Sequence, residues 1–331
     1  MQEEAKAYTV REFNYLTIKY IAMNTTSDSR SIYEIVTSKL IEQLEKGVVP
    51  WQQPWTKAGF PQNLVTGRHY RNLNWLLLSM LGYERNLFLT FNQAVEMGAR
   101  IKKGEKSHIV VFWKKQKADE EDAENTKPKF ILRYYLLFNI SQCENIPEKY
   151  LVALPNPDPN PIHKCAELVQ FMPNRPDIVH EKHKAYYSVT DDVINMPRIE
   201  TFKDSESYYA VLFHELVHCT GHPSRLNRKE LNERSMKSYS IEELTAEIGS
   251  CFLLFHSGID SINFQNSAAY IKSWIKKLEN DSKYIFHASS QAQRAIDYIL
   301  DIAEPEQIPE AVESAISQGG LTPDELDELP F

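Results

Sequence analysis

Two histidines four residues apart, His214 and His218, limit what this chain can fold into more than any other feature. On an α-helix, residues at positions i and i+4 lie one turn apart on the same face, so both imidazoles can reach one cation. Glu215 lies about 100° around such a helix from the first histidine, beside the cation. There its carboxylate can take a proton from water and later pass it to a leaving amine. The pattern predicts a metallopeptidase-type zinc helix; the competing interpretation is a buried helix with two hydrogen-bonded histidines.

A catalytic zinc ion takes three protein ligands and keeps a fourth position open. A third histidine ten residues after the first is excluded, because Ser224 occupies that position. A glutamate from a following helix is the alternative, and Glu243 and Glu247 lie one turn apart in a strongly helical segment. We predict one Zn²⁺ per chain with Glu243 as third ligand, and Glu247 holding a ligating imidazole through its second nitrogen. The reverse assignment of the two glutamates stays open.

Charge is divided unevenly along the chain. Residues 30–143 hold 17 Lys and Arg against 11 Asp and Glu, a net charge of +6, whereas residues 144–331 hold 17 against 30, a net charge of −13. A basic half joined to an acidic half is typical of a polyanion-binding module beside a second unit. A chance partition of charge is the alternative.

The basic half also alternates aromatic and cationic residues, as a surface for single-stranded nucleic acid requires: cations hold phosphates and aromatic faces stack on bases. Helix-turn-helix and zinc-finger spacings are absent, so single-stranded DNA is favoured and duplex DNA is the alternative. Burial in the core is an equal alternative for each tryptophan. The candidate DNA-binding residues are Trp51, Trp55, Arg68, Tyr70, Arg71, Lys102, Lys103 and Lys106.

Proline at every second position from Pro155 to Pro161 excludes a helix or a central strand and predicts a semi-rigid spacer. We therefore expect an α+β protein of two domains. The predicted parts are a flexible N-terminal extension (1–29), an α+β DNA-binding domain (30–145), a proline-rich linker (146–161), a mainly helical metal-binding domain (162–303) and an acidic C-terminal tail (304–331).

Local patterns predict several elements. Ser31 and Glu34 form a capping box at the start of a helix, and Thr90 caps a short one. Residues 48–55, with two prolines, should be extended and present two tryptophans. Residues 108–113 and 130–138 read as paired strands, and 193–197 as an edge strand that could pair with a peptide substrate.

Composition excludes several classes of protein. Apolar residues make up 42% and charged residues 25%, the mixture of a folded globular chain, and no apolar run is long enough to cross a membrane. The four cysteines have no paired spacing, so a disulfide framework is not expected. With no secretory signal pattern at the N-terminus, we expect a cytoplasmic protein without membrane partners.

Longer segments resemble ArdC-type antirestriction proteins over about residues 31–302. The first half resembles their N-terminal domain in Tyr33-Glu34-Ile35-Val36, Leu44-Glu45-Lys46-Gly47-Val48-Val49-Pro50-Trp51 with Pro54-Trp55, Thr66-Gly67-Arg68-x-Tyr70-Arg71-x-x-Asn74 and Thr90-Phe91-x-Gln93-Ala94. The second half resembles their zincin-like peptidase domain in Tyr208-Tyr209-x-x-Leu212-x-His214-Glu215-Leu216-Val217-His218, Glu242-Glu243-Leu244 and Ala246-Glu247-Ile248-Gly249. One departure is Asn72, where the family usually has glycine.

The resemblance implies a mobile-element protein that protects incoming DNA from host restriction during transfer. It implies a single-stranded-DNA-binding domain, to which Asn74 is added as a contact, and a gluzincin-type peptidase domain with the pattern HExxH. His214, His218 and Glu243 carry over as zinc ligands and Glu215 as the catalytic glutamate.

Two functions follow. In the first, the zinc domain cleaves a host protein, either a restriction component or another DNA-bound protein of unknown identity. In the alternative, the protein is a non-proteolytic DNA-binding protector whose zinc domain is a scaffold or a partner-binding module.

Overall fold

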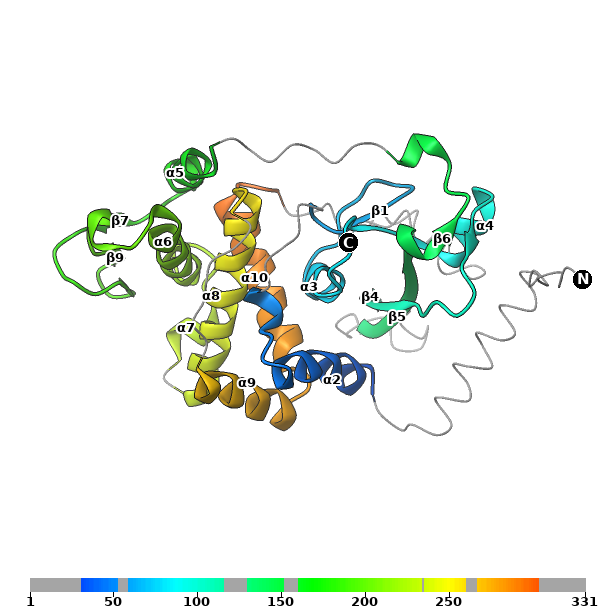
Figure 1. The fold of residues 1–331 in the computed structure, drawn as a ribbon. Helices are drawn as coiled ribbons and strands as arrows, with labels where there is room; N and C mark the ends of the chain where they lie inside the picture. The colour runs from blue at the N-terminus through cyan, green and yellow to red at the C-terminus, as the bar shows by residue number, and fades with distance from the viewer. Residues whose placement is uncertain are drawn as a thin grey trace, which may run out of the picture.

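The computed structural model describes residues 31–52, 59–115, 130–151, 160–233, 235–259 and 267–303, and its architecture is α+β (Figure 1). The helices are α2 (Ile32–Glu45), α3 (Leu73–Ser79), α4 (Phe91–Glu96), α5 (Pro161–Phe171), α6 (Ser205–Thr220), α7 (Lys229–Asn232), α8 (Met236–His256), α9 (Ala268–Asn280) and α10 (Tyr284–Ile299). Short 3₁₀ helices are η1 (Pro50–Gln52), η3 (Ile140–Gln142), η4 (Glu148–Tyr150) and η5 (Ile199–Thr201). The strands are β1 (Gln62–Asn63), β2 (Leu87–Thr90), β3 (Arg100–Ile101), β4 (His108–Lys115), β5 (Phe130–Asn139), β6 (Cys143–Glu144), β7 (Asp177–Val179), β8 (Tyr186–Ser188) and β9 (Val193–Asn195).

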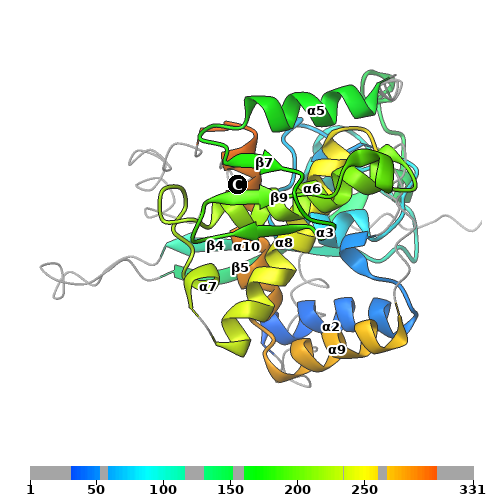
Figure 2. The same ribbon diagram turned by 90° about the vertical axis from the view of Figure 1, so that its left-hand side faces the viewer.

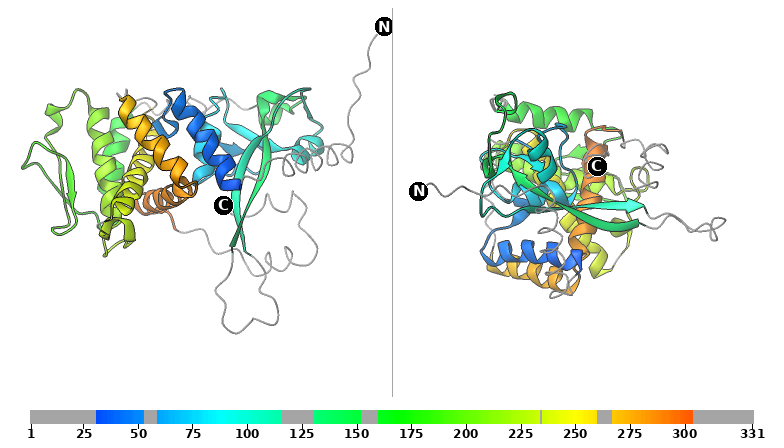
Figure 3. Two further views of the ribbon diagram at one scale, coloured as in Figure 1. Left: turned by 90° about the horizontal axis from the view of Figure 1, so that it is seen from below. Right: turned by 90° about the vertical axis from the view of Figure 1, so that its right-hand side faces the viewer.

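The first half of the chain is built on a four-stranded sheet in the order β1-β2-β5-β4. The long antiparallel ribbon of β4 and β5 runs in register from His108 opposite Leu137 to Lys115 opposite Phe130 and confirms the predicted strand pair (Figure 3). The predicted caps are also confirmed, because Ser31 and Thr90 each form a capping box at the start of α2 and α4.

The expectation of an extended segment at 48–55 is wrong where the structure describes it. Residues 50–52 form η1, and Trp51 is fully buried instead of being presented to solvent. Pro50 starts this single turn, a position where proline costs no helical hydrogen bond. Residues 53–58, which include Trp55, lie outside the described residues.

The second half places a three-stranded sheet beside a group of helices in which α8 packs against both α6 and α10 (Figure 2). The sheet order is β7-β9-β8, with β9 parallel to β7 and antiparallel to β8. The prediction that residues 193–197 form an edge strand is therefore wrong: β7, which the sequence analysis missed, covers one side of β9. The edges of this sheet are β7 and β8.

One apolar core joins the two halves of the chain. Helix α2 lies alongside α9, and α3 contacts α10 on one side and β4 on the other (Figures 1 and 3). Side chains of α2, η1 and α3 share a hydrophobic cluster with side chains of α8, α9 and α10. Polar contacts also cross this boundary: the Thr37 hydroxyl donates to the carbonyl of Ser282 at 2.8 Å.

The turn before α3 makes further cross-contacts. The Asn72 backbone N–H donates to Gln293 on α10, and the guanidinium of Arg71 pairs with Asp297. Asn72 has a φ of +52° and a ψ of −138°, a backbone conformation that glycine adopts most readily.

The four cysteines are buried and carry free thiols in this structure. Among the described residues, every helix is too short or too polar to traverse a lipid bilayer.

Candidate metal centre

Helices α6 and α8 bring the predicted metal-binding residues together. Asp204 caps α6 by accepting from the backbone N–H of Ser207. The two helices approach closely at Gly249, where an added Cβ would lie 2.7 Å from a methyl carbon of Val217. Only glycine fits at this crossing, and the close approach lets side chains of α8 reach the histidines of α6.

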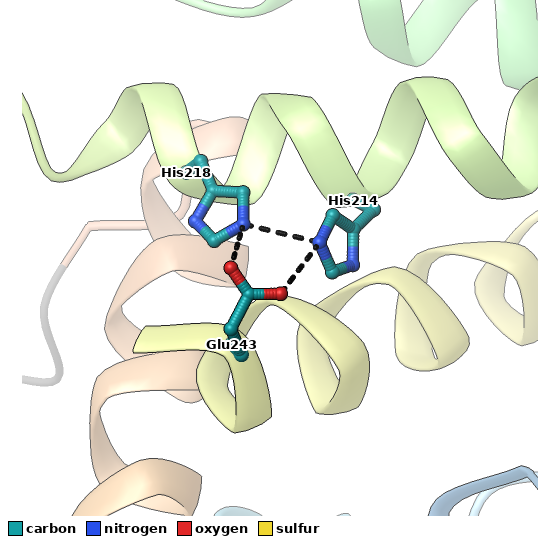
Figure 4. Close-up of side chains that lie close together, drawn as sticks. All are labelled: His214, His218 and Glu243. Carbon is teal, nitrogen blue, oxygen red and sulfur yellow. Dashed lines mark hydrogen bonds and ion pairs between the residues drawn. The ribbon is translucent and has the colours of Figure 1, made fainter. Parts of the chain in front are cut away.

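Figure 4 shows His214 and His218 from α6 facing Glu243 from α8. The two Nε2 atoms lie 3.0 Å apart. Carboxylate oxygens of Glu243 lie 3.6 Å from Nε2 of His214 and 3.7 Å from Nε2 of His218. One ligand atom from each of the three residues lies within 4.8 Å of the other two. Three atoms bound to one tetrahedral ion at about 2.1 Å would be about 3.4 Å apart. The spacing and the donor set of two imidazoles and a carboxylate suit a divalent transition metal.

The second nitrogen of His218 faces a carboxylate that the sequence analysis missed. Nδ1 lies 3.0 Å from Oε1 of Glu242, which leaves Nε2 directed at the metal position. Arg228 donates from Nε to the other oxygen of Glu242 at 2.9 Å. Burial opposes ionisation of Glu242, but the hydrogen bonds from Arg228 and His218 outweigh it and lower its pKa to about 2.

Negative charge surrounds the other imidazole. Burial alone would lower the pKa of His214, but the close contact with Glu243 and the charges of Glu215, Glu243 and Glu247 raise it. Glu215 is 9% exposed on α6, next to the two histidines. Carboxylates gathered around partly buried imidazoles provide the electrostatic conditions for binding a cation.

Two further side chains reach the carboxylates of α8. Tyr239, one turn before Glu243, hydrogen-bonds that carboxylate although it is 59% exposed. Glu247 accepts hydrogen bonds from Trp51 and Tyr270, and its charge affects the pKa of His214. Its predicted bond to a ligating imidazole remains a prediction, whereas Glu242 makes such a contact with His218. Tyr239 could have been found from the sequence by its four-residue spacing to Glu243, but Arg228 carries no local signal.

The candidate DNA-binding residues fall into two groups. Trp51 is buried against α8, and Arg71 pairs with Asp297. Asn74 exchanges two hydrogen bonds with the backbone of Val111, and Tyr70 packs edge-on against Phe88. The exposed members are the cations Arg68, Lys102, Lys103 and Lys106.

Known proteins share both halves of this architecture. Residues 30–138 match the N-terminal domain of the anti-restriction factor ArdC, and residues 167–291 match the zincin-like metallopeptidase family. The metal-free crystal structure of the antirestriction protein ArdC from the R388 plasmid is 34% identical, with a TM-score of 0.68 over 82% of this chain and 97% of that one. Its Mn(II)-bound structure gives 34% identity and a TM-score of 0.67 over 84% of this chain and 100% of that one.

Two proteins from Escherichia coli called DNA primase TraC are 30% and 31% identical over 91% and 85% of this chain. The chain spans only 30% and 20% of their lengths. Since the similarity to the plasmid protein runs through both domains and nearly the whole of its length, this chain belongs to the ArdC family of antirestriction proteins, with an ArdC N-terminal domain followed by a zincin-like domain.

Proposed function

We propose that this protein binds single-stranded DNA of a mobile element through its N-terminal domain and hydrolyses a host protein at a zinc site in its C-terminal domain. The target is a restriction component or another DNA-bound protein, met in the cytoplasm of the host. The observation that supports this most is the convergence of His214, His218 and Glu243, with Glu215 buried on the same helix as the two histidines.

The chemistry follows from the donor set. His214, His218 and Glu243 would hold a Zn²⁺, which would polarise a peptide carbonyl and lower the pKa of water. Glu215 accepts the proton of the attacking water and returns it to the leaving amine. Glu242 fixes the ring of His218, with its own position held by Arg228.

The structures of the related plasmid protein support a catalytic metal site in this chain rather than a structural one. Its metal-free and Mn(II)-bound structures match this chain with TM-scores of 0.68 and 0.67. Structural zinc sites contribute much of a domain's folding free energy, so a fold present without metal argues for an exchangeable site. A purely structural site would also have no use for Glu215.

The N-terminal domain supports binding to DNA. The exposed cations Arg68, Lys102, Lys103 and Lys106 suit phosphate contacts, and the TraC relatives place this region in proteins named for DNA priming. Binding to the transferred strand would concentrate the peptidase domain near proteins that act on that strand.

Glu215→Gln separates the proteolytic function from the non-proteolytic alternative. It removes the proton acceptor but none of the three ligands, so zinc content and binding to an oligonucleotide should be unchanged while protection of unmodified plasmid DNA in a restricting host is lost. Glu206→Gln, nine residues earlier on α6, is the matched control and should protect normally. Full protection by Glu215→Gln would refute proteolysis and favour the non-proteolytic alternative.

A further inference from the structure

A buried tryptophan from the N-terminal domain reaches the helix that carries Glu243. The indole Nε1 of Trp51 donates to Oε2 of Glu247 at 2.8 Å, and the hydroxyl of Tyr270 donates to the same oxygen. The Trp51 ring is fully buried and packs edge-on against Trp274, with ring centroids 5.8 Å apart. Side chains from η1 and α9 thus converge on one carboxylate of α8.

Glu247 follows Glu243 by one helical turn, so both carboxylates lie on the same face of α8. Its charge interacts with His214. Burial raises the pKa of Glu247, and the hydrogen bonds from Tyr270 and Trp51 act against this rise. The two donors therefore both fix the carboxylate and favour its charged form.

We infer that Trp51 is a positioning residue of the metal centre, which fixes Glu247 one helical turn from Glu243 and so completes the centre from the other domain. The inference rests on the metal site of the proposed function but not on proteolysis. Trp51 acts through Glu247, to which its indole N–H donates.

The same contacts explain why Trp51 does not act as a base-stacking residue in this structure. Both the ring and the N–H are occupied within the protein. Stacking on a base would require breaking the bond to Glu247 and removing a buried ring from the core that α2 shares with α9. Residues 31–52 are consequently part of the metal-binding unit.

Trp51→Phe tests this inference, because it keeps an aromatic ring and removes the N–H donor. Zn²⁺ affinity, measured on the full chain by competition with a chromophoric chelator, should fall by about 10-fold, as for other supporting partners of metal ligands. The absorption spectrum of the Co²⁺-loaded protein should change as well, because the field around His214 changes. Tyr270→Phe, which removes the second donor, should act in the same direction and provides an independent variant.

Trp75→Phe is the matched control. Trp75 is 1% exposed, lies in the same hydrophobic cluster and packs edge-on against Phe252 of α8. It should lower stability but leave Zn²⁺ affinity within twofold and the Co²⁺ spectrum unchanged. Equal losses of Zn²⁺ affinity in Trp51→Phe and Trp75→Phe would overturn the inference. Normal metal binding by both Trp51→Phe and Tyr270→Phe would overturn it as well. Neither result depends on the outcome for Glu215→Gln.

Discussion

Glu242→Leu removes the carboxylate that joins Arg228 to His218, and it should cause two separate losses. The Arg228 and Glu242 side chains are 1% and 4% exposed, so the variant leaves a buried guanidinium without its counter-ion. Removing one partner of a buried ion pair costs about 3–5 kcal/mol of unfolding free energy. His218 also loses the partner of its Nδ1 atom, which should lower Zn²⁺ affinity by about 10- to 100-fold.

The double variant Arg228→Met/Glu242→Leu separates these losses. With both charges gone, the unfolding free energy should rise by about 2 kcal/mol or more above that of Glu242→Leu, because apolar side chains can replace a buried ion pair at little net cost. Recovery should be incomplete, since Arg228 also donates to Val217 and Thr220. Zn²⁺ affinity should stay low, because nothing restores the partner of His218.

Urea unfolding of the metal-free proteins measures the first quantity, and competition with a chromophoric chelator at pH 7 measures the second. In the double variant, the unfolding free energy should recover while Zn²⁺ affinity stays low. If Zn²⁺ affinity returned to the wild-type value together with stability, Glu242 would not be the residue that orients His218.

Two other regions give testable expectations. Burial lowers the pKa of His256 to about 4 from 6.5, so the unfolding free energy has its full value above pH 6.5 and falls as the pH drops towards 4. The loss is about 3 kcal/mol. Urea unfolding in the presence of a chelator should give a flatter dependence of stability on pH for His256→Phe than for the wild type, and parallel profiles would refute the assignment. For DNA, the double variant Lys103→Ala/Lys106→Ala should weaken binding to an oligo(dT) strand and reduce the slope of log affinity against log salt concentration by about 1.4. An unchanged slope would show that neither lysine contacts a phosphate.

The parts of the fold that local chemistry controls were predicted from the sequence. Capping boxes at Ser31 and Thr90 depend on residues three positions apart, and the pairing of β4 with β5 depends on two adjacent apolar strands. His214, His218 and Glu243 also come together as the helical spacing within α6 and within α8 allowed, although that spacing left Glu247 open as an alternative and the role of the three as ligands stays a prediction. In each case the decisive residues lie close together in the sequence or share one periodic pattern.

The predictions that failed depended on distant partners. Trp51 was expected on the surface, yet its partner Glu247 is 196 positions away. Arg71, a candidate DNA contact, pairs with Asp297 across 226 positions, and its contact with DNA stays a prediction. Strand β9 was expected at an edge because its parallel neighbour β7 was not recognised from the sequence. Composition identifies a cation or an aromatic ring but does not reveal which remote segment will cover it.

The core that α2, η1 and α3 share with α8, α9 and α10 bears on how such proteins are inherited. An exchange of genes that replaced either half alone would bring together unmatched apolar faces and leave the carboxylates of Glu247 and Asp297 without Trp51 and Arg71. Recombination should therefore move both halves as one cassette. The two TraC proteins, which match 91% and 85% of this chain within much longer sequences, are what such joint transfer would produce.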